Sequence, residues 1–200
     1  CGYRIVHFDS SDRRGIDVAF LYRTTCSSLL STYLKTPETD GNKLQTRDML
    51  HISLKDLHTD EIYDYIVCHH PSKFGGEESS RPKRLAAMTA LKEMCDSLAN
   101  RNLIVMGDFN DVPSAAQFDM LDSSLVNKSD SLHAAGRGTI RYEGKWELID
   151  MFLVSPHISD NTEMEIVKVP FLMTRDTKHP GEKPLRTYSG PRHLGGVSDH

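Results

Sequence analysis

Short runs of apolar residues, separated by polar turns, dominate the chain and predict more strands than helices. The runs that predict strands are rich in β-branched and aromatic residues. They cover residues 14–23, 49–57, 62–68, 103–106, 148–154 and 164–169. The run at 49–57 alternates loosely, which predicts a half-exposed strand. The run at 103–106 is wholly apolar, which predicts a strand buried on both faces.

One segment has the period of an amphipathic helix. Its apolar side chains recur at three- and four-residue steps: Leu85, Met88, Leu91, Cys95 and Leu98. Pro82 suits the first turn of this helix, and Asn100 ends it,. Residues 170–197 are rich in glycine, proline and basic residues, which predicts a loop,. Because strands outnumber helices, an α/β or α+β layered sandwich is favoured over a helical bundle.

Composition limits the classes of protein that the chain can represent. Its 200 residues include 24 Lys and Arg against 28 Asp and Glu, a net charge of -4, with 38% hydrophobic residues. This is the composition of a globular domain, and it excludes a collagen, a coiled coil and a disulfide-stabilised miniprotein. No stretch approaches the roughly 18–20 apolar residues of a membrane span. The acidic balance argues against binding of nucleic acid by bulk charge, although a local basic groove is compatible with it.

The four cysteines have no spacing that indicates a zinc site. They are Cys1, Cys26, Cys68 and Cys95. Cys68 lies in an apolar run and Cys95 on the apolar face of the predicted helix, so we expect buried free thiols at these positions.

Polar clusters lie at the ends of apolar strands or inside them, where a rigid sheet can position functional side chains. Asp108 and Asn110 follow the strand at 103–106. In an extended segment their side chains would project to the same side, an arrangement that suits a polarised water and a bound oxyanion. The alternative is an Asp-rich turn without function.

Asp150 lies inside the apolar run 148–154. A carboxylate there loses solvation unless a partner compensates, and a histidine is the natural partner because the pair would favour the protonated imidazole. The alternative is a bulge that lets Asp150 reach solvent. Asp199 and His200 place an oxygen ligand for a hard metal beside an imidazole,. His69 and His70 follow the strand at 62–68, where histidines are also common as surface or core residues.

Five motifs, in this order along the chain, resemble the endonuclease/exonuclease/phosphatase superfamily, and most closely a Bacteroides-type branch of it. They are residues 12–23, 69–76, 107–111, 146–150 and 186–200. The resemblance implies an α/β (α+β) four-layered α/β/β/α sandwich of the deoxyribonuclease I-like type, formed by residues 1–200 as one domain. It also implies hydrolysis of a phosphoester with Mg²⁺ or Mn²⁺ by a nuclease, phosphatase or phosphodiesterase.

The resemblance also implies roles for single residues. Asp108 would align or deprotonate the attacking water, and Asn110 would hold that water or a phosphate oxygen. His69 would contact the phosphate of the substrate. An in-line displacement needs such stabilisation of charge on the phosphoryl oxygens.

Two further roles fall on the strand at 148–154 and on the last residues. By the resemblance, His200 would stabilise the charge of the transition state or act as general base, and Asp150 would orient it. Asp199 would bind the metal directly or through water, and Asp108 would be a second metal ligand. The implied catalytic residues are therefore His69, Asp108, Asp150 and His200, with Asn110 and His69 binding substrate.

The chain departs from the family pattern in ways that set further expectations. Cys68 and His70 replace the usual neighbours of His69. The family's early strands, which end in a catalytic Asn and in a Glu that binds the metal, have no counterpart in this sequence, and neither has the strand after the last motif. We therefore expect a partial domain that lacks its first strands and its last strand. Relatives of this branch are often exported, so a periplasmic or extracellular full-length protein is one option, and the location stays open.

The alternative function is a catalytically incompetent fragment or relic that acts as a scaffold or binds polyanions. Such a module would need a basic face. The candidates for that face are Arg81, Lys83, Arg84, Lys183, Arg186 and Arg192. Whether the phosphoester substrate is a nucleic acid or a small molecule is open, and so is the oligomeric state.

Overall fold

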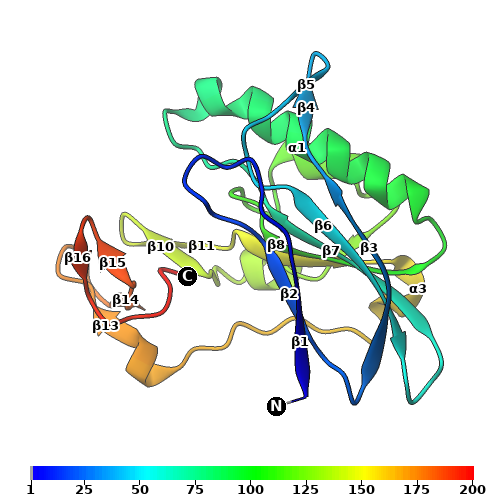
Figure 1. The fold of residues 1–200 in the computed structure, drawn as a ribbon. Helices are drawn as coiled ribbons and strands as arrows, with labels where there is room; N and C mark the ends of the chain where they lie inside the picture. Colours follow the sequence, from blue (N-terminus) through cyan, green and yellow to red (C-terminus); the bar gives the residue numbers. More distant parts are fainter. Residues whose placement is uncertain (1) are drawn as a thin grey trace.

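The computed structural model describes residues 2–200 and is drawn in Figure 1. Its centre is a six-stranded mixed sheet with the strand order β3-β6-β7-β8-β12-β9. The strands are β3 (Ser27–Lys35), β6 (Met49–Asp56), β7 (Ile62–His69), β8 (Asn102–Asp108), β12 (Asp150–Val154) and β9 (Val126–Asn127). β7 and β8 run parallel, and the other neighbours are antiparallel. Helix α1 (Glu77–Ser97) joins the parallel pair, which requires such a crossover,.

Shorter elements surround this sheet. Five hairpins pair β1 (Tyr3–His7) with β2 (Ala19–Arg23), β4 (Glu38–Thr39) with β5 (Asn42–Lys43), β10 (Ile140–Tyr142) with β11 (Lys145–Glu147), β13 (Met173–Arg175) with β14 (Glu182–Pro184), and β15 (Tyr188–Ser189) with β16 (Arg192–His193). The short helices are α2 (Asp130–Ala134) and α3 (Pro156–Ser159), with 3₁₀ turns at Ala116–Met120 and Pro170–Leu172. Among the described residues, no helix is long and apolar enough to span a membrane.

Helix α1 lies across one face of the sheet (Figure 1) and forms the main core with it. Met88, Leu91 and Cys95 are buried there as predicted. The helix begins at Glu77 rather than at Pro82, with two glutamates in its first turn, where the helix dipole favours negative charge,. Leu98, just after the helix, is buried too, so the predicted stripe is confirmed from Met88 onward and differs only near its start, where Leu85 is exposed and Arg84 is buried instead.

The opposite face of the sheet is covered over β6 by the hairpin β1–β2. Val6 and Tyr22 pack there against Leu50 and Ile52. This explains why the prediction of a half-exposed strand at 49–57 is wrong, since β6 is covered on both faces. Burial instead alternates along β8, so the prediction that this strand is buried on both faces is also wrong.

The remaining strand predictions have mixed outcomes. Strands are confirmed at β7 and β12, while the strand expected at 14–23 begins only at Ala19. Residues 164–169 form no strand, because they have no neighbouring strand to pair with, and Val167 is exposed,. The loop predicted at 170–197 contains two of the hairpins.

Strand β3 was not predicted, because it is an edge strand whose serine and threonine residues hide the period of a strand. Cys68 and Cys95 are buried free thiols as expected, and Cys1 lies outside the described residues.

Candidate active site

Three neighbouring strands bring candidate residues together at one end of the sheet, which we call the site edge: β7 and β8 end there, and β12 begins there. His69 ends β7 and lies opposite Asp108, the last residue of the parallel strand β8. Asp108 in turn lies opposite Asp150, the first residue of the antiparallel strand β12. A parallel and an antiparallel neighbour thus place one imidazole and two carboxylates side by side. The Nε2 atom of His69 is 3.5 Å from Oδ2 of Asp108.

The close approach of β7 and β8 at this edge depends on Gly107. Its φ is +136°, and a Cβ atom there would lie 1.9 Å from the carbonyl oxygen of Cys68. Every residue except glycine carries a Cβ, so no other residue fits without separating the two strands. Gly107 therefore sets the position of Asp108, which follows it.

Asn110 lies in a tight turn rather than in an extended segment. Its φ is +52°, a left-handed conformation that asparagine adopts more readily than most residues,. Its N–H donates to Oδ1 of Asp108 at 2.7 Å, and its side-chain amide donates to the carbonyl oxygen of His70 at 2.9 Å. The premise that Asp108 and Asn110 project to one side of an extended strand is therefore wrong, and a turn holds them together instead.

Asp150 and His200 form a hydrogen-bonded pair although 50 residues separate them. Oδ2 of Asp150 is 2.6 Å from Nδ1 of His200. The same oxygen accepts a hydrogen bond from the hydroxyl of Thr139 at 2.5 Å. The C-terminal segment thereby returns to the site edge near the hairpin β10–β11 (Figure 1). This geometry leaves Nε2 of His200 free of the pair.

The pKa values of the two histidines at this edge move in opposite directions. Burial, reinforced by the charges of Arg47 and Arg14, lowers the pKa of His69 to about 4. Burial alone would also lower the pKa of His200, but its hydrogen bond to Asp150 and the negative charge of that residue outweigh burial and raise it. The site therefore contains one neutral and one cation-favouring imidazole.

Asp108 has a pKa raised to about 6, first because it is buried and second because the charge of Asp150 repels its ionised form. His70, which follows His69, is wholly buried, and burial lowers its pKa to about 3. His70 packs edge-on against the buried ring of Phe109 and contributes its carbonyl oxygen to the site. Its imidazole is therefore part of the core.

Asp108, Asp150 and His200 offer ligand atoms that all lie within 4.8 Å of one another. Two carboxylates whose charges repel each other match a hard divalent cation, which proteins commonly hold through one or two carboxylates. Asp199, expected as a metal ligand, lies outside this group, and its carboxylate pairs with Arg186 at 3.0 Å.

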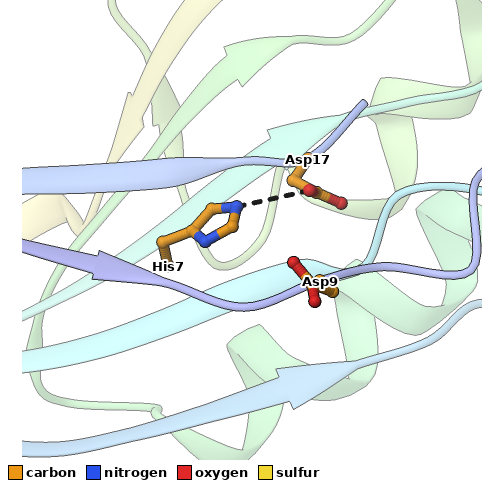
Figure 2. A group of neighbouring side chains, drawn as sticks. All are labelled: His7, Asp9 and Asp17. Carbon is orange, nitrogen blue, oxygen red and sulfur yellow. Dashed lines mark hydrogen bonds and ion pairs between the residues drawn. The ribbon is translucent and has the colours of Figure 1, made fainter. Parts of the chain in front are cut away.

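A second group of ligand-type side chains was not found from the sequence. It consists of His7, Asp9 and Asp17 (Figure 2), from the end of β1 and from the loop that follows it. Nε2 of His7 is 3.3 Å from Asp17. The backbone N–H of Ser10 donates a hydrogen bond to the carboxylate of Asp17, and this bond lowers the pKa of Asp17. The same bond joins the two ends of the loop between β1 and β2. His7 and Asp9 are exposed, and within the group Asp17 is the residue whose contacts, to His7 and to the N–H of Ser10, hold this loop.

Arg47 is a buried neighbour of the site that was not predicted from the sequence. Its Nη1 donates to Asp12 at 2.9 Å, and its Nη2 donates to the carbonyl oxygen of His70 at 2.8 Å. In the sequence Arg47 stands out only as an arginine two residues before the predicted strand at 49–57, and nothing there indicates that it is buried or that it pairs with Asp12. The predicted basic face loses Arg84, which is buried and pairs with Glu77 and Asp111.

Comparison with known families gives a match over the whole chain. Residues 1–200 match the family model described as "Endonuclease/Exonuclease/phosphatase family". No curated protein sequence matches the chain.

Similar solved structures include the human Nocturnin catalytic domain with bound sulfate, at 17% identity and a TM-score of 0.58 over 78% of this chain. They also include a mannosyl-6-phosphatase from Bacteroides thetaiotaomicron, at 18% identity and a TM-score of 0.56 over 78%. A third is D. rerio TDP2 complexed with a single-strand DNA product, at 11% identity and a TM-score of 0.56 over 77%.

The likeness to these structures confirms the fold expected from the sequence, the α/β fold of the deoxyribonuclease I-like type. The match covers 62%, 63% and 62% of the three solved chains, so this chain spans less than two thirds of their length.

Proposed function

The chain belongs to the endonuclease/exonuclease/phosphatase family, and on that basis we propose that it hydrolyses a phosphoester with the help of a divalent cation, Mg²⁺ or Mn²⁺. The observation that carries this proposal is the meeting of His69, Asp108 and Asp150 in register at the site edge, with His200 bound to Asp150. An acid pair flanked by two histidines supplies both a proton acceptor and donors to a phosphoryl group.

Asp108 is suited to accept a proton from the attacking water. Its pKa of about 6 lies close to neutral pH, which is the condition under which a general base is both ionised and basic enough to act,. Asn110 is fixed beside it by the bond from its N–H to Oδ1. Without a cation on its carboxylate, Asp108 is the proton acceptor; with the cation bound there, it would align the attacking water instead, and the amide of Asn110 lies near that water or a phosphate oxygen.

The two histidines have different roles in this proposal. His69 is neutral at pH 7, so it donates one ring N–H to a phosphoryl oxygen without adding a charge,. His200 favours its cationic form because Asp150 accepts from Nδ1, and this leaves Nε2–H for the developing negative charge of the transition state. Asp150 acts as a positioning residue in this scheme.

The donor set fits a divalent cation. Asp108 would hold it, with Asp150 and His200 nearby and with Asp199 reaching it directly or through water after release from Arg186. When bound, the cation supplies charge neutralisation at the phosphoryl oxygens and lowers the pKa of a bound water. It would also relieve the repulsion between the two carboxylates.

The test is phosphate or p-nitrophenol release from p-nitrophenyl phosphate and from bis(p-nitrophenyl) phosphate, each with Mg²⁺, Mn²⁺ or EDTA. We expect activity that EDTA abolishes and that Asp108→Ala and His200→Ala each reduce by about 100-fold or more. Asp60→Asn and His58→Ala, in the turn between β6 and β7, are matched controls and should retain full activity.

Activity that survives Asp108→Ala or His200→Ala would contradict the assignment. A folded wild-type chain that releases nothing with either cation and either substrate would favour the catalytically incompetent alternative. Titration with Mg²⁺ would separate that alternative further, because the incompetent form should not bind the cation.

A further inference from the structure

A large cavity with basic walls lies beside the proposed reacting site. Its volume is about 890 Å³, and we call it the basic cavity. It lies among the loop between β1 and β2, the segment after β5 and the first turns of α1, three parts of the chain that approach one another in Figure 1. Its charged lining residues are Asp12, Arg13, Arg14, Lys43, Arg47 and Lys83.

The charge of the basic cavity is opposite to that of the whole chain. Five cationic side chains and one carboxylate line it, although the chain carries a net charge of -4. Asp12 pairs with Arg14 and Arg47. Among residues 2–200, no ion pair involves Arg13, Lys43 or Lys83. A concave surface with unpaired cations focuses its field on an anion far more than the same charges on a convex surface.

Two buried residues of the wall have polar atoms without a partner. Arg47 and Thr46 are each 5% exposed, and the Nε of Arg47 and the Oγ1 of Thr46 make no hydrogen bond. Leaving a buried polar atom unpaired costs free energy, so such atoms usually have a ligand or solvent partner. Both atoms are inaccessible from the cavity, so the donors that an oxyanion in the cavity can reach are those of the exposed side chains Arg13, Lys43 and Lys83,.

The cavity is connected to the reacting site through the main chain at His70. The Nη2 of Arg47 and the side-chain amide of Asn110 donate to the same carbonyl oxygen, that of His70. Pro71 and Ser72, which follow directly, line the cavity. The charges of Arg47 and Arg14 reach His69 and help to lower its pKa. The cavity therefore adjoins the end of β7 that carries His69, two residues before Pro71.

We propose that the basic cavity binds a phosphate group of the substrate other than the one that reacts, so that preferred substrates carry at least two phosphates. This inference rests on the proposed function for the identity of the reacting group, but the anion site itself does not. The cavity is large enough for a phosphorylated sugar or a short stretch of phosphodiester chain,. Phe74, 93% exposed, lies on its lining and offers an aromatic face to either.

The test measures anion binding without hydrolysis. Inorganic tripolyphosphate is titrated calorimetrically into the chain in EDTA, so that no cation bridges the anion to the reacting site, and the His200→Ala variant below reports on binding there. We expect saturable binding that weakens by about tenfold or more in Lys43→Glu/Lys83→Glu and that falls steeply with added salt. The matched control is Arg4→Glu/Arg192→Glu, which changes the net charge equally at exposed positions outside the cavity.

Further arms identify the source of the second phosphate and separate this proposal from the proposed function. Fructose 1,6-bisphosphate and a thymidine tetranucleotide are titrated in the same way. Loss of affinity for the bisphosphate in Lys43→Glu/Lys83→Glu indicates a small-molecule substrate, and loss of affinity for the tetranucleotide indicates a nucleic-acid strand. Binding should persist in His200→Ala, so a chain that binds anions but hydrolyses nothing would refute only the proposed function. Absence of saturable binding, equal weakening in the control, or loss in His200→Ala would overturn the anion site.

Discussion

Replacing Asp108 by asparagine should stabilise the fold while removing activity. Asp108 is mostly buried, lies opposite Asp150 across the β8–β12 ladder, and has a pKa raised from 3.8 to about 6. Because the folded state binds the proton more tightly than the unfolded state, ionised Asp108 destabilises the protein at pH 7. Asparagine has the same shape and can still accept the N–H of Asn110 through its side-chain oxygen.

The size of this effect follows from the pKa difference. The pKa of Asp108 differs by about two units between the folded and unfolded states, which corresponds to at most about 3 kcal/mol,. Because neighbouring side chains relax around the asparagine, we expect the free energy of unfolding to rise by about 1–3 kcal/mol. For a chain of this length that is a rise in Tm of roughly 3–9 °C. As the pH falls through 6, wild-type Asp108 becomes protonated and the penalty disappears, so the two proteins should converge near pH 4.

The assay is urea or thermal unfolding in EDTA at pH 7.5 and at pH 4.5. Asp56→Asn is the matched control, because backbone hydrogen bonds lower the pKa of Asp56, so its replacement removes no penalty and should give no gain,. Asp108→Asn that destabilises the chain at pH 7.5, or a gain that is equally large at pH 4.5, would refute the reasoning that burial and carboxylate repulsion raise this pKa.

Further predictions concern stability. Gly107→Ala should destabilise the fold by about 3 kcal/mol or more in urea unfolding, because its Cβ would collide with the carbonyl of Cys68, whereas Gly190→Ala, also at positive φ but in open space, should cost only about 1 kcal/mol,. His70→Leu should flatten the loss of stability between pH 6 and pH 4 by about 1.4 kcal/mol per pH unit, because the unfolded chain protonates His70 near 6.5 and the folded chain only near 3,. Asp64→Leu should destabilise by about 3–5 kcal/mol, since Asp64 is fully buried and pairs with His51 and Arg101,.

The sequence predicts those features of the site that depend on residues close together in the chain. A carboxylate among apolar residues needs a partner wherever it lies, which is why Asp150 indicated a histidine from the sequence alone. The same reasoning cannot say which histidine, because 50 residues of loop and hairpin separate Asp150 from His200. The one error in the predicted stripe of α1, at Leu85, has the same origin, since Arg84 is buried there through its pairs with Glu77 and Asp111, and Asp111 lies far along the chain.

The turn at Asn110 and the burial of Arg47 escaped prediction for a related reason. A left-handed asparagine is specified by the two hydrogen bonds that it makes to Asp108 and to the main chain at His70, and the second of these is known only from the tertiary structure. Arg47 converges on the same carbonyl from a third segment. Residues that meet at one main-chain atom from distant parts of the chain leave no periodic signal.

The uneven distribution of charge around the site gives a physical reason for the different pKa values of the two histidines. His69 and His200 lie at the site edge, and burial disfavours the charged form of both. The arginines on the cavity side add positive charge near His69, whereas Asp150 adds negative charge and a hydrogen bond at His200. The imidazole whose pKa is lowered therefore lies nearer the arginines, and the imidazole whose pKa is raised lies beside the carboxylate of Asp150. A substrate with two phosphates would meet the cations of the basic cavity at one end and His200 at the other, while Asp108, the proton acceptor that we propose, lies close to both histidines.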